Sequence, residues 1–145
     1  MWFLKSYFKG FSGNEKRAAG VSIQYEFDIK NSKVLNLDLF GATKSDSNYA
    51  EEISEDIQPN DLIIRDLGYY SKNNLLKISS KKAYFISRLN AKADVYQESH
   101  TGELQKVCFK KLYQQMARCK QSAIEISVYI GKNKELPVRL IIELM

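Results

Sequence analysis

The stretch that most constrains the fold is a short apolar run between charges, at residues 61–71 (Asp-Leu-Ile-Ile-Arg-Asp-Leu-Gly-Tyr-Tyr-Ser). The run over residues 62–64 predicts a strand buried on both faces. It is followed by Asp66, and Ser71 is a suitable N-cap for a helix over residues 72–81. Open α/β sheets hold ligands and catalytic groups at the carboxyl ends of their strands. From this stretch alone, an Asp that caps a turn is equally consistent.

The segments on either side of this strand predict further elements. Residues 21–30 alternate apolar and polar side chains, which predicts a half-buried strand with its apolar face inward. Residues 33–40 alternate again after a two-residue turn, which predicts an antiparallel hairpin. A helix is expected over residues 46–57 and a buried strand over residues 83–89. The order hairpin, helix, strand, helix, strand predicts an α/β fold with a mixed sheet.

The last third of the chain has a different pattern. Residues 94–97 predict a short strand, and residues 123–130 and 136–144 predict a second hairpin around a glycine-containing loop. Apolar residues between 104 and 116 have helical spacing, but residues 107–109 are also compatible with a strand. The choice between helix and strand stays open there.

Composition limits the class of protein. A chain of 145 residues with 44% hydrophobic residues is long enough for one domain with a real core. No apolar run approaches the length needed to cross a membrane. Cys108 and Cys119 lie eleven positions apart without a neighbouring histidine, which is neither a zinc spacing nor a disulfide framework. The two thiols favour a reducing cytosol.

The net charge of +5 is unevenly distributed along the chain. Residues 1–20 carry four Lys or Arg and one Glu; residues 26–66 carry four basic and ten acidic residues; residues 72–120 carry eleven basic and three acidic residues. An acidic segment between two basic ones suits a metal centre flanked by a phosphate-binding surface. Chance clustering on a solvated surface is the alternative.

Several segments are recognisable when they are read in series: residues 7–13 (Tyr-Phe-Lys-Gly-Phe-Ser-Gly), 20–28 (Gly-Val-Ser-Ile-Gln-Tyr-Glu-Phe-Asp), 61–71, 83–89 (Ala-Tyr-Phe-Ile-Ser-Arg-Leu), and 128–132 with 136–141. Together they resemble bacterial insertion-sequence transposases of the DDE, RNase-H-like class. The last pair is similar to the β-rich region inserted into that family's catalytic domain. The resemblance covers nearly the whole chain in order.

The resemblance implies phosphoryl transfer on DNA with two metal ions, in which three carboxylates hold two Mg²⁺. Hard cations prefer oxygen ligands, as in an Asp-Asp-Glu set. Asp66 matches the second aspartate, in the family's Asp-x-Gly-Tyr motif, which implies a catalytic and metal-binding role. Arg88 matches a basic residue near DNA phosphate after the last core strand. Lys16 and Arg17 are further candidates for contacts with the DNA backbone.

The chain also departs from the family's pattern. The first aspartate belongs on a strand upstream of Met1, and the glutamate belongs on a helix beyond Met145. Glu143 is a poor substitute because it falls on a predicted strand. We therefore expect a fragment with one of three metal-binding carboxylates, unable to cut or join DNA. The upstream strand is central in an RNase-H-like sheet, so its absence should leave exposed strand edges.

These observations give one expectation for the whole chain: an α/β (α+β) fold, with an RNase-H-like mixed sheet that lacks its first strand and a β-rich insertion. Residues 1–20 should form an arm and glycine loop, residues 21–90 the partial catalytic core, and residues 91–145 the insertion. The implied partner is DNA, at insertion-sequence ends and targets, in the bacterial cytoplasm at the nucleoid and not at a membrane. Self-association of the complete enzyme stays open. The alternative is a non-catalytic basic module that binds nucleic acid or protein.

Overall fold

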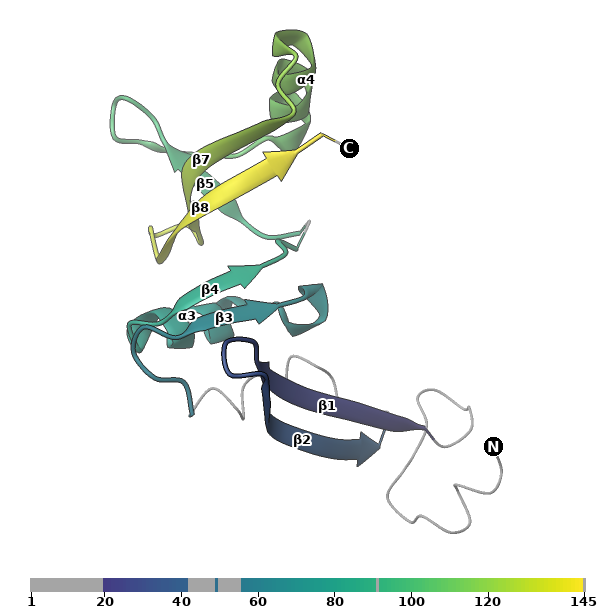
Figure 1. Ribbon diagram of the computed structural model, residues 1–145. Helices are drawn as coiled ribbons and strands as arrows, with labels where there is room; N and C mark the ends of the chain where they lie inside the picture. Colours follow the sequence, from purple (N-terminus) through teal and green to yellow (C-terminus); the bar gives the residue numbers. More distant parts are fainter. Residues whose placement is uncertain (1–19, 42–48, 50–55, 91, 145) are drawn as a thin grey trace. The chain divides into compact units, whose positions relative to one another are not determined.

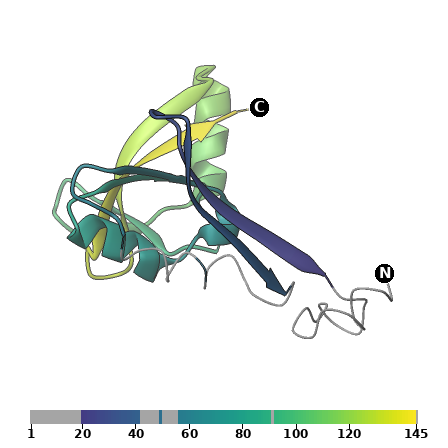
Figure 2. The ribbon, with the colours of Figure 1, turned by 60° about the horizontal axis from the view of Figure 1, so that its bottom comes forward.

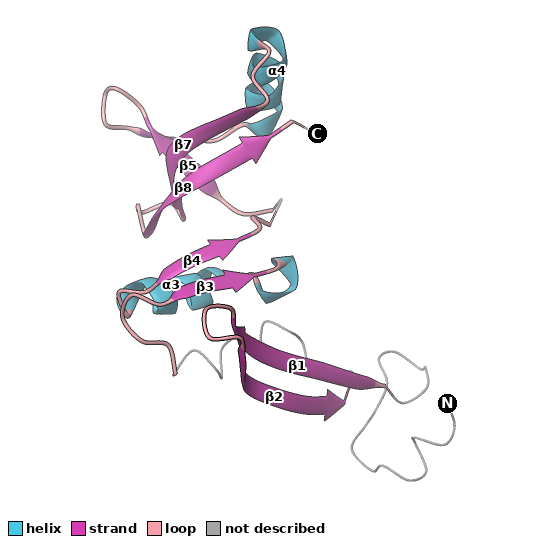
Figure 3. Ribbon diagram, viewed as in Figure 1, coloured by secondary structure: helices cyan, strands magenta, loops and turns pink. Residues whose placement is uncertain are grey.

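The chain forms two compact units, residues 1–87 and residues 88–145 (Figure 1). The computed structural model describes residues 20–41, 49, 56–90 and 92–144. Both units combine strands with an α-helix (Figure 3). This mixed architecture confirms the predicted α+β fold class.

The first unit opens with the predicted antiparallel hairpin. Strand β1 (Val21–Asp28) pairs with β2 (Lys33–Gly41), with one irregularity of register between Glu26 and Phe27. The turn is held by Asp28, whose carboxylate accepts hydrogen bonds from the backbone N–H of Asn31 at 3.0 Å and from its Nδ2 at 2.6 Å. An aspartate that accepts bonds from a residue three positions on is a common turn device.

The prediction for the faces of this hairpin is wrong. Its apolar side chains are exposed: Ile23 is 62% exposed, Tyr25 63% and Leu37 65%. The polar face is the covered one, and Gln24 is only 5% exposed. Periodicity shows which side chains share a face, but the face that becomes buried depends on the neighbouring layer. Among the described residues, that layer lies on the polar side.

The second part of this unit is a parallel strand pair with a helical connection. Strands β3 (Leu62–Arg65) and β4 (Tyr84–Ser87) pair in parallel, and α3 (Lys72–Ser80) joins them. A crossover helix is the usual link between parallel neighbours. Helix α3 starts after Ser71, as predicted, but the Ser71 side chain makes no capping hydrogen bond.

The β3–β4 pair is buried on one face only. Leu75 and Ile78 of α3 are buried beside Ala83, while Ile63 and Phe85 are half-buried. The other face is exposed, contrary to the prediction of a doubly buried strand over residues 62–64 and of a buried strand over residues 83–89; its residues are Leu62, Ile64, Tyr84 and Ile86. In the described part of the chain, β1–β2 and β3–β4 are separate sheets.

The helix predicted over residues 46–57 falls mostly outside the described residues. Tyr49 is helical, and both Tyr49 and Ile57 are buried. Their burial agrees with the predicted inward face of that segment.

The second unit is built on a four-stranded antiparallel sheet in the order β6-β5-β7-β8. Its strands are β5 (Val95–Glu98), β6 (Leu104–Lys106), β7 (Ala123–Ile130) and β8 (Leu136–Glu143). The β7–β8 hairpin was predicted, and it runs in unbroken register from Ala123 opposite Glu143 to Ile130 opposite Leu136. Gly131 leaves β7 at φ +98°, a conformation that glycine adopts without strain.

Helix α4 (Phe109–Cys119) follows β6 and leads into β7. The open choice over residues 104–116 resolves into a strand and then a helix, with Met116 the most deeply buried residue of α4. In two views, α4 stands at the end of the hairpin where β7 begins and β8 finishes (Figure 2). Cys108 and Cys119 are exposed free thiols. No helix within the described ranges is long and apolar enough to cross a membrane.

Candidate active site

Asp66 lies directly after β3, at the N-cap position of a single 3-10 turn, η2 (Leu67–Tyr69). The turn is closed by the backbone, because the N–H of Tyr69 donates to the Asp66 carbonyl oxygen at 3.1 Å. The Asp66 side chain is exposed and makes no capping hydrogen bond to the turn. The side chain is therefore not used as a cap, which was the alternative considered for this residue.

The residue before Asp66 anchors the strand end to the hairpin. The Arg65 guanidinium lies 3.6 Å from Glu26 Oε1, and the two side chains are 11% and 25% exposed. The other Glu26 oxygen accepts a hydrogen bond from Asn36 Nδ2 at 3.1 Å. Burial lowers the pKa of Arg65, and the Glu26 carboxylate opposes that shift. Arg65 stays charged nevertheless, because guanidinium is not deprotonated in proteins.

The turn after Asp66 is anchored to the same hairpin. The Tyr69 hydroxyl donates to Gln24 Oε1, and the Tyr49 hydroxyl donates to Asp38 Oδ2 at 2.9 Å. Burial, together with the hydrogen bond to Asp38, raises the pKa of Tyr49 well above its usual value. Tyr49 also meets the Phe40 ring edge-on, with 5.6 Å between ring centroids.

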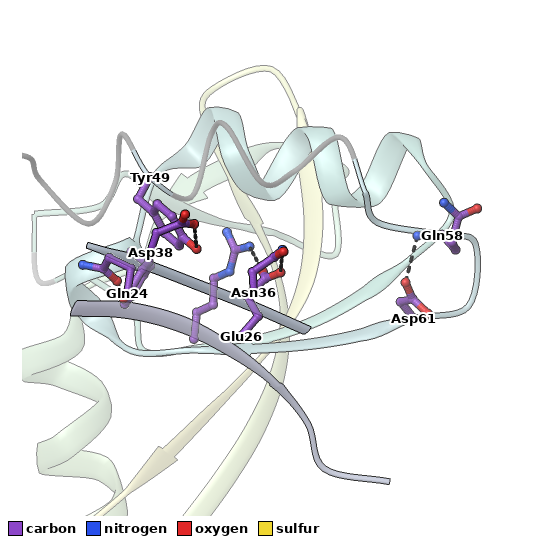
Figure 4. Close-up of polar contacts among 9 residues, drawn as sticks. Gln24, Glu26, Asn36, Asp38, Tyr49, Gln58 and Asp61 are labelled. Atoms are coloured by element: carbon purple, nitrogen blue, oxygen red, sulfur yellow. Dashed lines mark hydrogen bonds and ion pairs between the residues drawn. The ribbon is translucent and has the colours of Figure 1, made fainter. Parts of the chain in front are cut away.

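We call this group the polar cluster; its members are Gln24, Glu26, Asn36, Asp38, Tyr49, Arg65 and Tyr69. Figure 4 shows the four hairpin members on one side of β1 and β2. Asp66 stands between two members of the cluster, Arg65 and Tyr69. Anchors on both sides of a residue restrict the backbone that carries it, so the cluster fixes the position of Asp66 relative to the hairpin.

The described residues do not form a complete metal site. No three His, Cys, Asp or Glu side chains come together among the described residues. Two-metal chemistry needs several carboxylate ligands, and the end of β3 offers Asp66. The described residues alone do not fit a bound pair of Mg²⁺ ions.

The other predicted site residues are distributed as follows. Arg88 is exposed and is the first residue after β4. Lys16 and Arg17 lie outside the described residues.

The sequence predictions missed the polar cluster. Two signals pointed to it: an arginine at the end of an apolar strand, and two acids, Glu26 and Asp38, on the polar face of the hairpin. The polar face was interpreted as the solvent side, so its acids were not considered as partners for Arg65.

Comparison of the sequence with known proteins identifies a family. The profile described as Transposase DDE domain matches residues 4–144. The transposase for insertion sequence element IS231B of Bacillus thuringiensis subsp. berliner is 33% identical over 150 residues, covering 96% of this chain and 31% of the relative. The IS231E transposase of B. thuringiensis subsp. finitimus is 32% identical, covering 90% of this chain and 30% of the relative.

A more distant relative has the same description. The transposase for insertion sequence element IS1151 of Clostridium perfringens is 26% identical over 152 residues, covering 96% of this chain and 32% of the relative. The chain spans about a third of the length of these curated relatives. No solved structure matches it. The family match over nearly the whole chain shows that this protein belongs to the DDE transposase family of bacterial insertion sequences.

Proposed function

We propose that this chain carries part of the catalytic domain of a DNA transposase, and that Asp66 is one of its three catalytic carboxylates. The reaction would be cleavage and rejoining of DNA at insertion-sequence ends. The observation that supports this role best is the setting of Asp66: a side chain at the carboxyl end of a parallel strand, with an anchored residue before it and another after it.

The cofactor in this proposal is Mg²⁺, bound by Asp66 together with two carboxylates outside the described residues. When bound, the metal pair would activate the attacking oxygen and stabilise the leaving one. The chain's own contribution is to hold the Asp66 carboxylate in place through Arg65 and Tyr69. With one such carboxylate, the 145-residue chain alone is expected to be inactive in DNA cleavage and joining.

The DNA substrate requires cationic contacts. We assign such contacts to Arg88, after β4, and to Lys16 and Arg17, because the guanidinium and ammonium groups of these residues pair with phosphate oxygens. The proposed location is the bacterial cytoplasm, at the nucleoid, where the DNA substrate is found.

The test uses a chimera in which this chain replaces the matching third of the IS231B transposase. The chimera should join insertion-sequence ends to target DNA in a Mg²⁺-dependent reaction. Asp66→Asn should abolish the reaction, because an amide removes the charge that holds the metal ions. Should the chimera be inactive, the same exchange is made in the intact relative, at the aspartate aligned with Asp66.

Asp61→Asn is the matched control. It removes one carboxylate charge before the same strand, and an amide oxygen can still accept the Gln58 N–H that Asp61 Oδ2 accepts at 2.8 Å. Strand transfer should persist in this control. Retained transfer in Asp66→Asn would refute the catalytic assignment, and DNA binding without any transfer by the intact relative would favour the non-catalytic alternative.

A further inference from the structure

Helix α4 has two different sides. Phe109, Leu112 and Met116 are half-buried or buried and follow helical spacing. The exposed residues of α4 include Tyr113, which is 44% exposed, and a group of polar side chains that we call the basic face of α4: Lys110, Lys111, Gln114, Gln115 and Arg118. Residues four apart are neighbours on a helix surface, so Lys110, Gln114 and Arg118 form one continuous row.

Among the described residues, no carboxylate forms an ion pair with Lys110, Lys111 or Arg118. From residue 104 to residue 124 the sequence contains no Asp or Glu. Two other cations of the same unit have carboxylate partners. Lys106 Nζ lies 2.6 Å from Asp94 Oδ1, and Lys134 Nζ lies 2.7 Å from Glu98 Oε1. In the part of this unit that the structure describes, Lys106 and Lys134 are paired with carboxylates beside the sheet, whereas the cations of α4 have no carboxylate neighbour in sequence from residue 104 to residue 124.

The arrangement also costs helix stability. Lys110 and Lys111 stand in the first turn of α4, which contains no acidic residue, and Cys108 provides no side-chain cap. Positive charges at the positive end of the helix dipole are unfavourable by about 0.3–1 kcal/mol each. A cationic face that weakens its own helix is explained by an anionic partner that neutralises it.

The dimensions of the face match a DNA backbone. Lys110 and Arg118 are eight residues apart, which is about 12 Å along a helix at about 1.5 Å per residue. One DNA strand presents a phosphate about every 3.4 Å of helix axis, so the face spans several phosphates. Gln114 and Gln115 add donors that can bond phosphate oxygens between the cations.

We propose that the basic face of α4 contacts the phosphate backbone of double-stranded DNA. The inference rests on the proposed transposase function and assigns part of its DNA contact to a helix remote in sequence from Asp66. Phosphate contacts fix the orientation of a protein on DNA without reading the base sequence.

The test compares two triple variants of the full chain. Lys110→Gln, Lys111→Gln and Arg118→Gln remove three charges from α4, and glutamine preserves helix propensity. Lys106→Gln, Lys134→Gln and Arg139→Gln remove three charges that are paired with carboxylates in the same unit. The net charge changes equally, so a general effect of charge would weaken binding equally in both variants.

Binding to a 30-base-pair duplex is measured by fluorescence anisotropy over a range of salt concentrations, with circular dichroism to verify folding. The plot of log K against log salt should become less steep by about 2.7 for the α4 variant, from roughly 0.9 per phosphate contact. The paired-charge control should change the slope by less than about 1. A double variant, Lys110→Gln with Lys111→Gln, should give an intermediate slope and is used if the triple variant does not fold.

Equal slopes in the two triple variants would overturn the α4 assignment, as would a wild-type chain that does not bind DNA. An α4-dependent preference for an RNA duplex of the same length would overturn the choice of DNA. These outcomes are distinct from failure of the catalytic proposal, which shows as strand transfer that survives Asp66→Asn.

Discussion

Asp66 owes its setting to the two residues that flank it closely in sequence. Arg65 reaches Glu26 on β1, and Tyr69 reaches Gln24 on the same strand. Both contacts join segments that are about 40 residues apart in sequence. A short strand end that is held from both sides loses fewer rotamers and backbone states when a ligand binds, and such preorganisation is what the catalytic role proposed for Asp66 would require.

Arg65→Met should destabilise the first unit by about 1–3 kcal/mol, because Glu26 would keep a half-buried charge without its cationic partner. Hydrogen exchange of the β1 and β3 amides measures this loss locally. Adding Glu26→Gln should recover part of it, since an amide oxygen still accepts the Asn36 hydrogen bond.

Arg139→Met provides the matched control for Arg65→Met. Arg139 Nη1 lies 3.3 Å from Glu125 Oε1, but these side chains are 77% and 51% exposed. Removing an exposed ion pair should cost less than about 1 kcal/mol. Equal losses in both variants, or strict additivity of Arg65→Met with Glu26→Gln, would contradict a structural role for the half-buried Arg65–Glu26 pair.

At the scale of elements, the local sequence pattern predicted a strand or helix correctly where the residues of that element alone determine its structure. The alternation over residues 123–130 predicted β7 with both its bounds, and Ser71 marked the start of α3. Strand β6 was missed, because its three residues gain strand geometry from pairing with β5 across the turn that contains Gly102. Because the strand geometry of β6 depends on β5, the alternation of apolar and polar residues within β6 itself does not predict it.

Leu136→Ala should destabilise the second unit by about 2–5 kcal/mol, because a fully buried side chain leaves a cavity. Leu136 is 1% exposed and pairs with Ile130 at the closed end of the hairpin. Ile141→Ala is the control on the same strand, since Ile141 is 61% exposed; it should change stability by less than about 0.5 kcal/mol. Hydrogen exchange of the β7 amides distinguishes the two, and similar losses would contradict the described core.

At the scale of the whole molecule, the first unit exposes an apolar face on each of the two sheets that its described residues form. The hairpin contributes Ile23, Tyr25 and Leu37 among others, and β3–β4 contributes Leu62 and Ile64. Monomeric proteins rarely expose large contiguous apolar areas without a role for them. The alternation in the sequence correctly grouped the hairpin side chains on one face. It did not reveal which face is covered, because that depends on layers contributed by other segments.

The native chain should therefore bind a dye that recognises apolar surface, such as anilinonaphthalene sulfonate. The double variant Ile23→Lys with Leu37→Lys should reduce the fluorescence of the bound dye severalfold without changing the circular dichroism spectrum. Ile141→Lys, which changes an exposed apolar residue of the second unit, is the control and should change the dye fluorescence little. Unchanged fluorescence in the double variant would contradict an exposed hairpin face.

The two cysteines have a practical consequence for the study of α4. Cys108 immediately precedes the helix and Cys119 ends it, and both thiols are exposed. Their separation of eleven residues is about 16 Å along the helix, too far for a disulfide between them. Each thiol can be modified with a fluorophore while the other is replaced by serine. The native cysteines thus provide a labelling site at each end of the helix. Unequal quenching of the two fluorophores by DNA would give the direction in which α4 lies on the duplex.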